Sequence, residues 1–116
     1  MRMWQVETKI MCRQHLLGEH RELHTFLGTI KKGIRIDGYI TNDLIEPESL
    51  IIRHRDVVRE MRSRGYKHHS ILRTCSELVN IPKEYFYHKI NKYKSLNELL
   101  RRCPECKRRH KEFEHA

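Results

Sequence analysis

A Gln-His pair, Gln14-His15, is followed within two helical turns by an Arg-Glu pair, Arg21-Glu22, and these residue types can do acid–base chemistry. A positioned carboxylate transfers protons and stabilises positive charge that develops during a reaction. With residues 100° apart, Gln14, Gly18 and Glu22 share one side of a helix. An ordinary solvated charge pair gives the same Arg-Glu dipeptide, so the pair alone leaves both interpretations open.

A second group of possible ligands lies near the C-terminus in the pattern C-x2-C-x3-H-x4-H, formed by Cys103, Cys106, His110 and His115. Four sulfur and imidazole ligands are enough for a tetrahedral zinc site, which we expect to be structural. The stretch between the two pairs is shorter than in a zinc finger, so His54 and His69 are alternative donors. A metal-free helix end with one cysteine pair is the competing interpretation.

Hydrophobic periodicity predicts a helix from about Met11 to Lys32, ended by Gly33, that carries the Gln-His and Arg-Glu pairs. Its buried stripe consists of Leu16, Leu23, Leu27 and Ile30. The opposite side of this helix is left free to do chemistry.

A second helix is predicted from Pro47, which suits a first helical position, to Arg64, with Gly65 as the C-terminal cap. Its buried stripe consists of Leu50, Val57, Val58 and Met61. Its other faces carry Arg53, Arg55, Arg59, Arg62 and Arg64. Together with Lys31, Lys32, Lys67, His68 and His69 these residues favour a solvated, phosphate-binding surface.

Further along, Pro82 predicts the start of a short helical stretch through Phe86. Ser95 with Glu98 has the form of a capping box before a last helix, which Pro104 should stop. The charged tail, residues 103–116, is expected to be ordered only if the cysteines and histidines tie it down. With weak strand signals, the sequence predicts one all-α domain over residues 1–116, built from three or four helices.

The composition favours a polyanion as partner. Lys and Arg number 24 against 15 Asp and Glu, which gives a net charge of +9 and a pI of about 9.7. No apolar run approaches the roughly 20 residues that a membrane-spanning helix needs, and Arg2, Glu7 and Lys9 stand where a signal peptide is apolar. Cys12 and Cys75 stand alone, which favours a reduced chain inside the cell.

Three segments resemble the pyrimidine-dimer DNA glycosylase and abasic-site (AP) lyase family of the phage endonuclease V type. Residues 14–23, QHLLGEHREL, are similar to the motif of that family's first helix. Residues 59–66, REMRSRGY, resemble the end of its second helix, and residues 81–86, IPKEYF, resemble the entry to its C-terminal part. The three segments follow one another in the family's order and imply its all-α fold.

The resemblance implies a reaction in which the N-terminal amine, here that of Met1, attacks the sugar beneath the damaged base and forms an imine. An α-amino group has an unperturbed pKa of roughly 7.7 to 8, so part of it is free base at neutral pH. Glu22 matches the family's catalytic carboxylate. The resemblance further assigns substrate binding to Arg2, Gln14, His15 and Arg21.

The chain departs from the family pattern in four places. Met1 must be retained and deformylated, because Arg2 disfavours its removal. Thr25 stands where the family has an arginine, the connection between the first two helices is shorter, and C-terminal aromatic residues are replaced around Cys103 and Cys106. These changes bear on lesion recognition more than on the chemistry.

The sequence therefore predicts a monomeric glycosylase and AP lyase that acts on UV-induced pyrimidine dimers in double-stranded DNA. We expect it inside a bacterial, archaeal or virus-infected cell, without a membrane partner. Catalysis needs no cofactor in this scheme, and a structural zinc ion is compatible with it. The alternative is a non-catalytic nucleic-acid-binding or structural virion protein on the same fold, stabilised by zinc.

Overall fold

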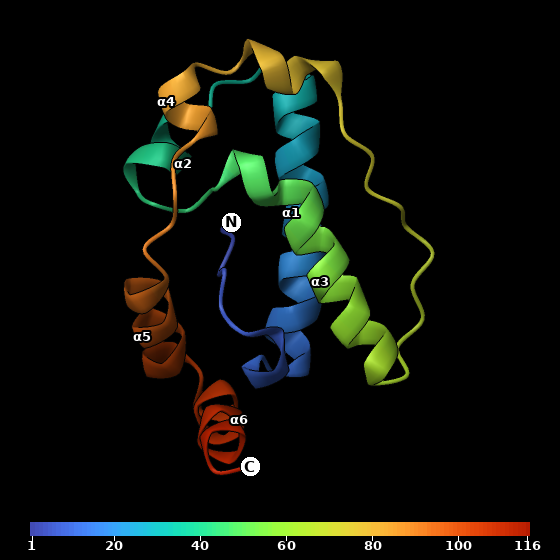
Figure 1. Ribbon diagram of the computed structural model, residues 1–116, viewed down its shortest axis with the longest axis vertical. Coiled ribbons are helices and arrows are strands. Elements are labelled where there is room, and N and C mark those ends of the chain that lie inside the picture. Colours follow the sequence, from blue (N-terminus) through green and yellow to red (C-terminus); the bar gives the residue numbers. More distant parts are fainter.

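The computed structural model describes all 116 residues and contains helices but no strand, which confirms the all-α prediction (Figure 1). The helices are α1 (Arg13–Lys31), α2 (Asp37–Thr41), α3 (Leu50–Ser63), α4 (Lys83–Phe86), α5 (Lys92–Arg102) and α6 (Pro104–Glu114). Three 3-10 turns connect them: η1 (Thr8–Ile10), η2 (Pro47–Ser49) and η3 (Ser76–Asn80). The number of helices exceeds the predicted three or four because it includes two short helices, α2 and α4, and because the charged tail is helical.

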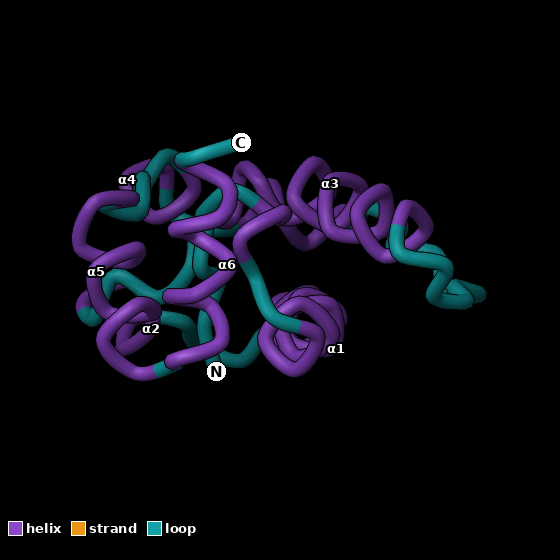
Figure 2. The backbone as a smooth tube through the Cα atoms, turned by 90° about the horizontal axis from the view of Figure 1, so that it is seen from below, coloured by secondary structure: helices purple, strands orange, loops and turns teal.

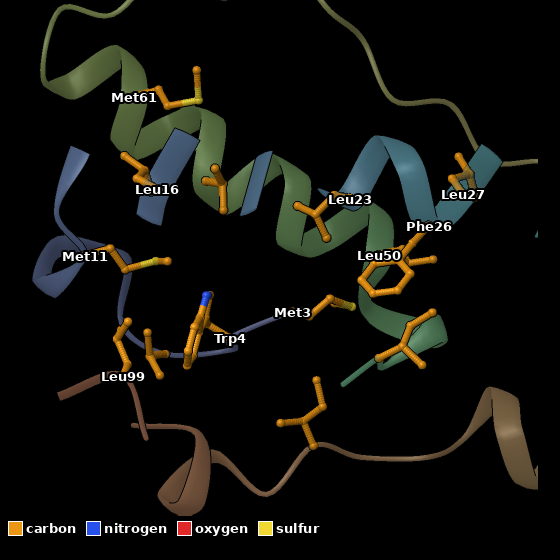
Figure 3. Close-up of a cluster of buried hydrophobic side chains, with 14 of the residues drawn as sticks. Met3, Trp4, Met11, Leu16, Leu23, Phe26, Leu27, Leu50, Met61 and Leu99 are labelled. Atoms are coloured by element: carbon orange, nitrogen blue, oxygen red, sulfur yellow. The ribbon is translucent and has the colours of Figure 1, made fainter. Parts of the chain in front are cut away.

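The longest helices, α1 and α3, pack against each other and form the centre of the molecule (Figure 1). All eight residues of the two predicted buried stripes are in fact buried. Phe26 joins them on α1 and is fully buried (Figure 3). Since a fully buried large apolar side chain contributes about 1.5–3 kcal/mol, this interface supplies much of the folding free energy.

Glycines end both central helices as predicted. Gly33 follows α1 with φ +74°, and Gly65 follows α3 with φ +82°, a left-handed conformation that side chains other than glycine rarely adopt. Beyond α3 the chain runs outward from the other helices, as the view from below shows (Figure 2). It then returns along the outer side of the helix pair to η3 (Figure 1).

The first residues of the chain belong to the core. Met3, Trp4 and Val6 are at most 7% exposed, and Met3 and Trp4 lie among the side chains of α1, α3 and Leu99 (Figure 3). The Met3 amide donates a hydrogen bond to the Leu44 carbonyl at 2.7 Å. This packing fixes the position of the chain's N-terminus.

The C-terminal helices differ from the prediction. Asn91 caps α5 by accepting a hydrogen bond from the Lys94 amide at 3.0 Å, so the helix begins before Ser95 and the predicted capping box is wrong. Ser95 is 2% exposed and donates to the Trp4 carbonyl, because it packs against the N-terminal segment. Pro104 ends α5 as expected and also opens α6 at its first position.

A buried ion pair joins three parts of the chain. Arg53 of α3 donates two hydrogen bonds to Glu19 of α1, at 2.6 and 2.9 Å, and a third to the Val6 carbonyl at 2.7 Å. The side chains are 6% and 0% exposed. The prediction that Arg53 lies on a solvated face is therefore wrong; four residues before Val57, it shares the face of α3 that meets α1.

We predict that Arg53→Met lowers the free energy of unfolding by about 3–5 kcal/mol, because it leaves the Glu19 carboxylate buried without its counter-ion. Urea unfolding measures the loss. The matched control is Arg55→Met on the same helix, whose side chain is 63% exposed and 3.8 Å from Asp56, and we expect a change of at most about 1 kcal/mol there. Equal effects of the two substitutions would contradict this assignment.

Candidate active site and a cysteine-histidine cluster

The N-terminus lies beside the carboxylate that the sequence singled out. The backbone amide of Arg2 donates a hydrogen bond to Glu22 Oε2 at 3.1 Å, across 20 residues of chain. Glu22 is half-buried on α1, whereas Met1 is 41% exposed. The structure therefore places the peptide bond between Met1 and Arg2 next to a carboxylate, with Met1 itself accessible.

The Arg2 side chain points inward and holds this end of the chain in place. Its guanidinium carbon lies 3.9 Å from the centre of the Trp4 ring, and Nη2 donates to Ser95 Oγ at 3.2 Å. Burial, followed by repulsion from Arg102, lowers the pKa of Arg2, yet a guanidinium remains protonated at neutral pH. The contacts visible for Arg2 position the N-terminus.

The surface of α1 next to Glu22 is open. Gln14 and Arg21 are exposed, and a Cβ added at Gly18 would meet no atom within 4 Å. A pocket of about 830 Å³ lies elsewhere, between the N-terminal segment, α3 and the start of α5, and neither Met1 nor Glu22 lines it. An open helix face suits a large, extended ligand better than an enclosed small molecule.

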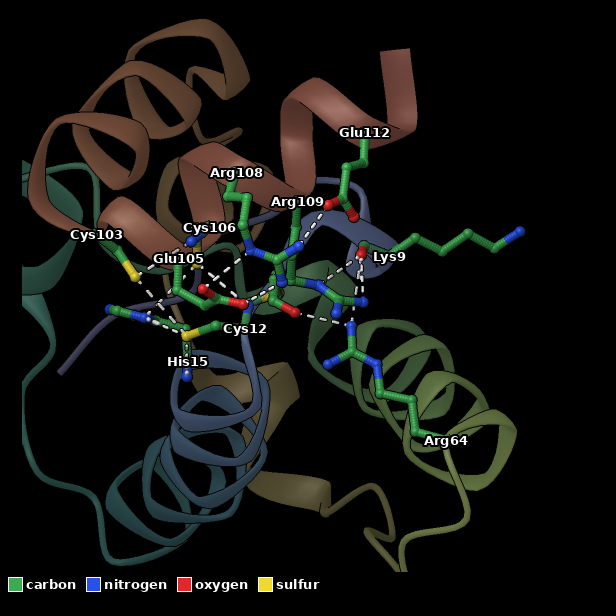
Figure 4. Close-up of polar contacts among 11 residues, drawn as sticks. Lys9, Cys12, His15, Arg64, Cys103, Glu105, Cys106, Arg108, Arg109 and Glu112 are labelled. Carbon is green, nitrogen blue, oxygen red and sulfur yellow. Dashed lines mark hydrogen bonds and ion pairs between the residues drawn. The ribbon is translucent and has the colours of Figure 1, made fainter. Parts of the chain in front are cut away.

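The His15 ring lies among three cysteines. Its Nδ1 lies 3.2 Å from Cys12 Sγ and 3.7 Å from Cys106 Sγ, and Cys12 Sγ lies 3.8 Å from Cys103 Sγ (Figure 4). The four ligand atoms all lie within 4.8 Å of one another. This group, called here the Cys3His cluster, joins the start of α1 to α6 and could hold a metal ion.

Of the predicted zinc ligands, the structure brings together Cys103 and Cys106 but not the two histidines. His110 lies 3.0 Å from Glu114 and His115 is exposed at the chain end, and neither belongs to the cluster. The member of the cluster that the sequence analysis missed is Cys12, which precedes the other two cysteines by about 90 residues. The spacing Cys12-x2-His15, which mirrors the Cys103-x2-Cys106 spacing, is the signal that could have found it.

Backbone amides surround the sulfurs. The Cys12 amide donates to Cys106 Sγ at 3.2 Å, and the Cys106 amide donates to Cys103 Sγ at 3.4 Å, where Cys103 caps α6. Such hydrogen bonds stabilise a thiolate. Burial raises the pKa of the Cys106 thiol, so a cation is needed to hold that buried sulfur in its anionic form.

Part of the predicted basic surface is present on α3. Arg55, Arg59 and Arg62 are exposed and, at positions i, i+4 and i+7, lie along one side of the helix. Arg64 does not belong to this stripe, because it pairs with Glu60 at 2.8 Å and donates to the Met11 carbonyl at 2.8 Å. The three exposed arginines are called here the arginine stripe.

Comparison with known proteins identifies the family. The profile of the pyrimidine dimer DNA glycosylase family matches residues 1–74, which include Met1, Glu22 and all of α1 to α3. The chain belongs to the pyrimidine dimer DNA glycosylase family. Its substrate is accordingly DNA. No curated protein and no solved structure matches the chain.

The match ends before η3, so Cys103 and Cys106 lie outside it. None of the helices combines the length and the apolar character needed to cross a membrane.

Proposed function

We propose that this protein is a glycosylase and AP lyase that acts on UV-induced pyrimidine dimers in duplex DNA through the Met1 amine and Glu22. The observation that carries the proposal is the 3.1 Å hydrogen bond between the Arg2 amide and Glu22, which places the N-terminal residue beside a carboxylate. The match to the glycosylase family over residues 1–74 supports the glycosylase part of the proposal.

In the proposed reaction, the lone pair of the Met1 nitrogen forms a bond to C1′ of the damaged nucleotide. The C1′–base bond breaks and the base leaves with the bonding electrons. Loss of a proton from nitrogen and opening of the sugar ring give an imine. Removal of a C2′ proton then breaks the bond between C3′ and its oxygen, which expels the 3′ phosphate and cuts the strand; water finally hydrolyses the imine and regenerates the amine.

Glu22 has two tasks in this scheme. Its negative charge stabilises the cationic sugar and the protonated imine, and its oxygens accept and return protons as the ring opens. The packing of Met3 and Trp4 in the core keeps the amine near this carboxylate before the substrate arrives. Such preorganisation lowers the entropic cost of the attack.

DNA binding is proposed for the surface around Glu22 and for the arginine stripe. Gln14 and Arg21 are exposed on the open face of α1, where they can contact the sugar and phosphate groups near the nucleophile. The nucleotide must leave the base stack to meet the amine, and a damaged, weakly stacked step makes this displacement easiest. His15 is assigned here to the Cys3His cluster, on the distances given above.

We predict that Glu22→Gln lowers the rate of cleavage of dimer-containing DNA by a factor of roughly 10² to 10⁴. DNA binding should be retained. Glutamine keeps an oxygen that can accept the hydrogen bond from the Arg2 amide, so the N-terminus stays in place. Single-turnover cleavage and gel-shift binding measure the two effects. The control is Glu84→Gln, an exposed carboxylate of α4.

Unchanged cleavage by the Glu22→Gln variant would contradict the proposed mechanism. Absence of cleavage in the unaltered protein, with a free N-terminus and normal DNA binding, would instead favour the non-catalytic alternative.

We also propose that the Cys3His cluster binds one structural zinc ion. Tetrahedral coordination, with Zn–S near 2.3 Å and Zn–N near 2.0–2.1 Å, places two sulfurs roughly 3.8 Å apart and a sulfur and a nitrogen roughly 3.6 Å apart. The Cys12–Cys103 separation of 3.8 Å and the His15 separations of 3.2 and 3.7 Å fit this geometry. Zinc here would fasten α6 to the start of α1 without taking part in the reaction.

For this zinc site we predict that Cys106→Ser lowers the zinc content by one ion per chain, measured by elemental analysis. The variant should lose the stabilisation that bound zinc gives, about 4 kcal/mol where free zinc is 1,000 times the dissociation constant. Cys75→Ser, outside the cluster, is the control and should keep both zinc and stability. Equal zinc content in the two variants would refute the assignment.

A further inference from the structure

Four histidines meet on the side of the α1–α3 pair that faces the chain beyond α3. His20 and His24 lie one turn apart on α1, His54 lies on α3, and His68 lies in the segment that follows. The centre of the His20 ring lies 5.0 Å from those of His24 and His54 and 4.9 Å from that of His68. None of these residues belongs to the Cys3His cluster or contacts Glu22.

The ring nitrogens converge. The ligand nitrogens of His20, His54 and His68 lie within 4.8 Å of one another, and Nε2 of His24 lies 3.1 Å from Nε2 of His54. Nε2 of His20 and Nε2 of His68 are buried and have no hydrogen-bond partner. A buried polar atom without a partner costs about 1–3 kcal/mol, so the arrangement points to a ligand that satisfies these nitrogens.

The charges around the four rings do not favour their protonation as a way to satisfy these nitrogens. No carboxylate forms an ion pair with any of them, and Glu19, the nearest buried acid on α1, is already paired with Arg53. A neutral imidazole keeps one nitrogen lone pair that can bind a metal ion.

We propose that His20, His54 and His68 bind a divalent transition-metal ion of the zinc class, with His24 available as a fourth ligand. Imidazole ligands suit zinc, copper, nickel and iron, whereas magnesium and calcium prefer oxygen. A groove of about 370 Å³ lined by His54, His68 and the arginine stripe opens toward the rings and gives the ion a path from solvent.

The ion would attach the segment after α3 to the helix pair. His68 is the only one of the four histidines outside α1 and α3, and it follows Gly65, where α3 has ended. With the metal bound, this segment is held against the arginine stripe. This site is independent of the proposed glycosylase chemistry, which uses the opposite side of α1.

The test is a cobalt titration of metal-free protein in the Cys106→Ser background, where the Cys3His cluster is disabled. Cobalt bound only by imidazole shows visible d–d absorption without the intense sulfur-to-cobalt charge-transfer band. We expect one equivalent of Co²⁺ with that spectrum, and at least a 10-fold weaker affinity after His54→Gln or His20→Gln. His69→Gln, an exposed neighbour of His68, should leave binding unchanged.

Hydrogen exchange gives a second readout that does not depend on substituting any of the four histidines. In Cys106→Ser protein with its histidines intact, Co²⁺ should slow exchange of amides in residues 65–75. The proposal is overturned if this protein binds no cobalt, or if its affinity is the same in His54→Gln and His69→Gln. It is equally overturned if cobalt binds without protecting residues 65–75.

Discussion

The buried pair of Arg53 and Glu19 is the interaction on which the rest of the structure depends. Moving two charges out of water costs desolvation free energy. Their mutual attraction offsets this cost only where the remaining hydrogen-bond donors also have partners. Here the guanidinium spans the carboxylate of α1 and the Val6 carbonyl, at 2.6 to 2.9 Å. One side chain therefore sets the spacing of the two central helices and fixes the N-terminal segment between them and α5.

The packed N-terminal segment fixes which residue lies beside Glu22 of α1. Because Met3 and Trp4 are buried, the start of the chain is held beside Glu22. The same helix offers Cys12 and His15 at its start and His20 on another side. A carboxylate and two groups of side chains that could hold a metal ion thus share one rigid element, which can position side chains within fractions of an ångström.

Local patterns predicted much of this, because helix periodicity and glycine caps act over a few residues. Both buried stripes and the helix ends at Gly33 and Gly65 follow from such patterns. Contacts between distant residues were missed. No local pattern around Arg53 predicts its contact with a carboxylate 34 positions earlier. Cys12 is likewise remote in sequence from the other two cysteines. Both contacts depend on the whole fold.

The most direct measurement of the central claim is borohydride trapping. Untagged protein with a verified free N-terminus is incubated with duplex DNA carrying a thymine dimer or an abasic site, reduced, and mapped by mass spectrometry, with undamaged duplex as the control. Borohydride converts an imine into a stable amine, so we expect a covalent DNA adduct on the Met1 nitrogen. No adduct with either lesion, or an adduct on a lysine, would contradict it.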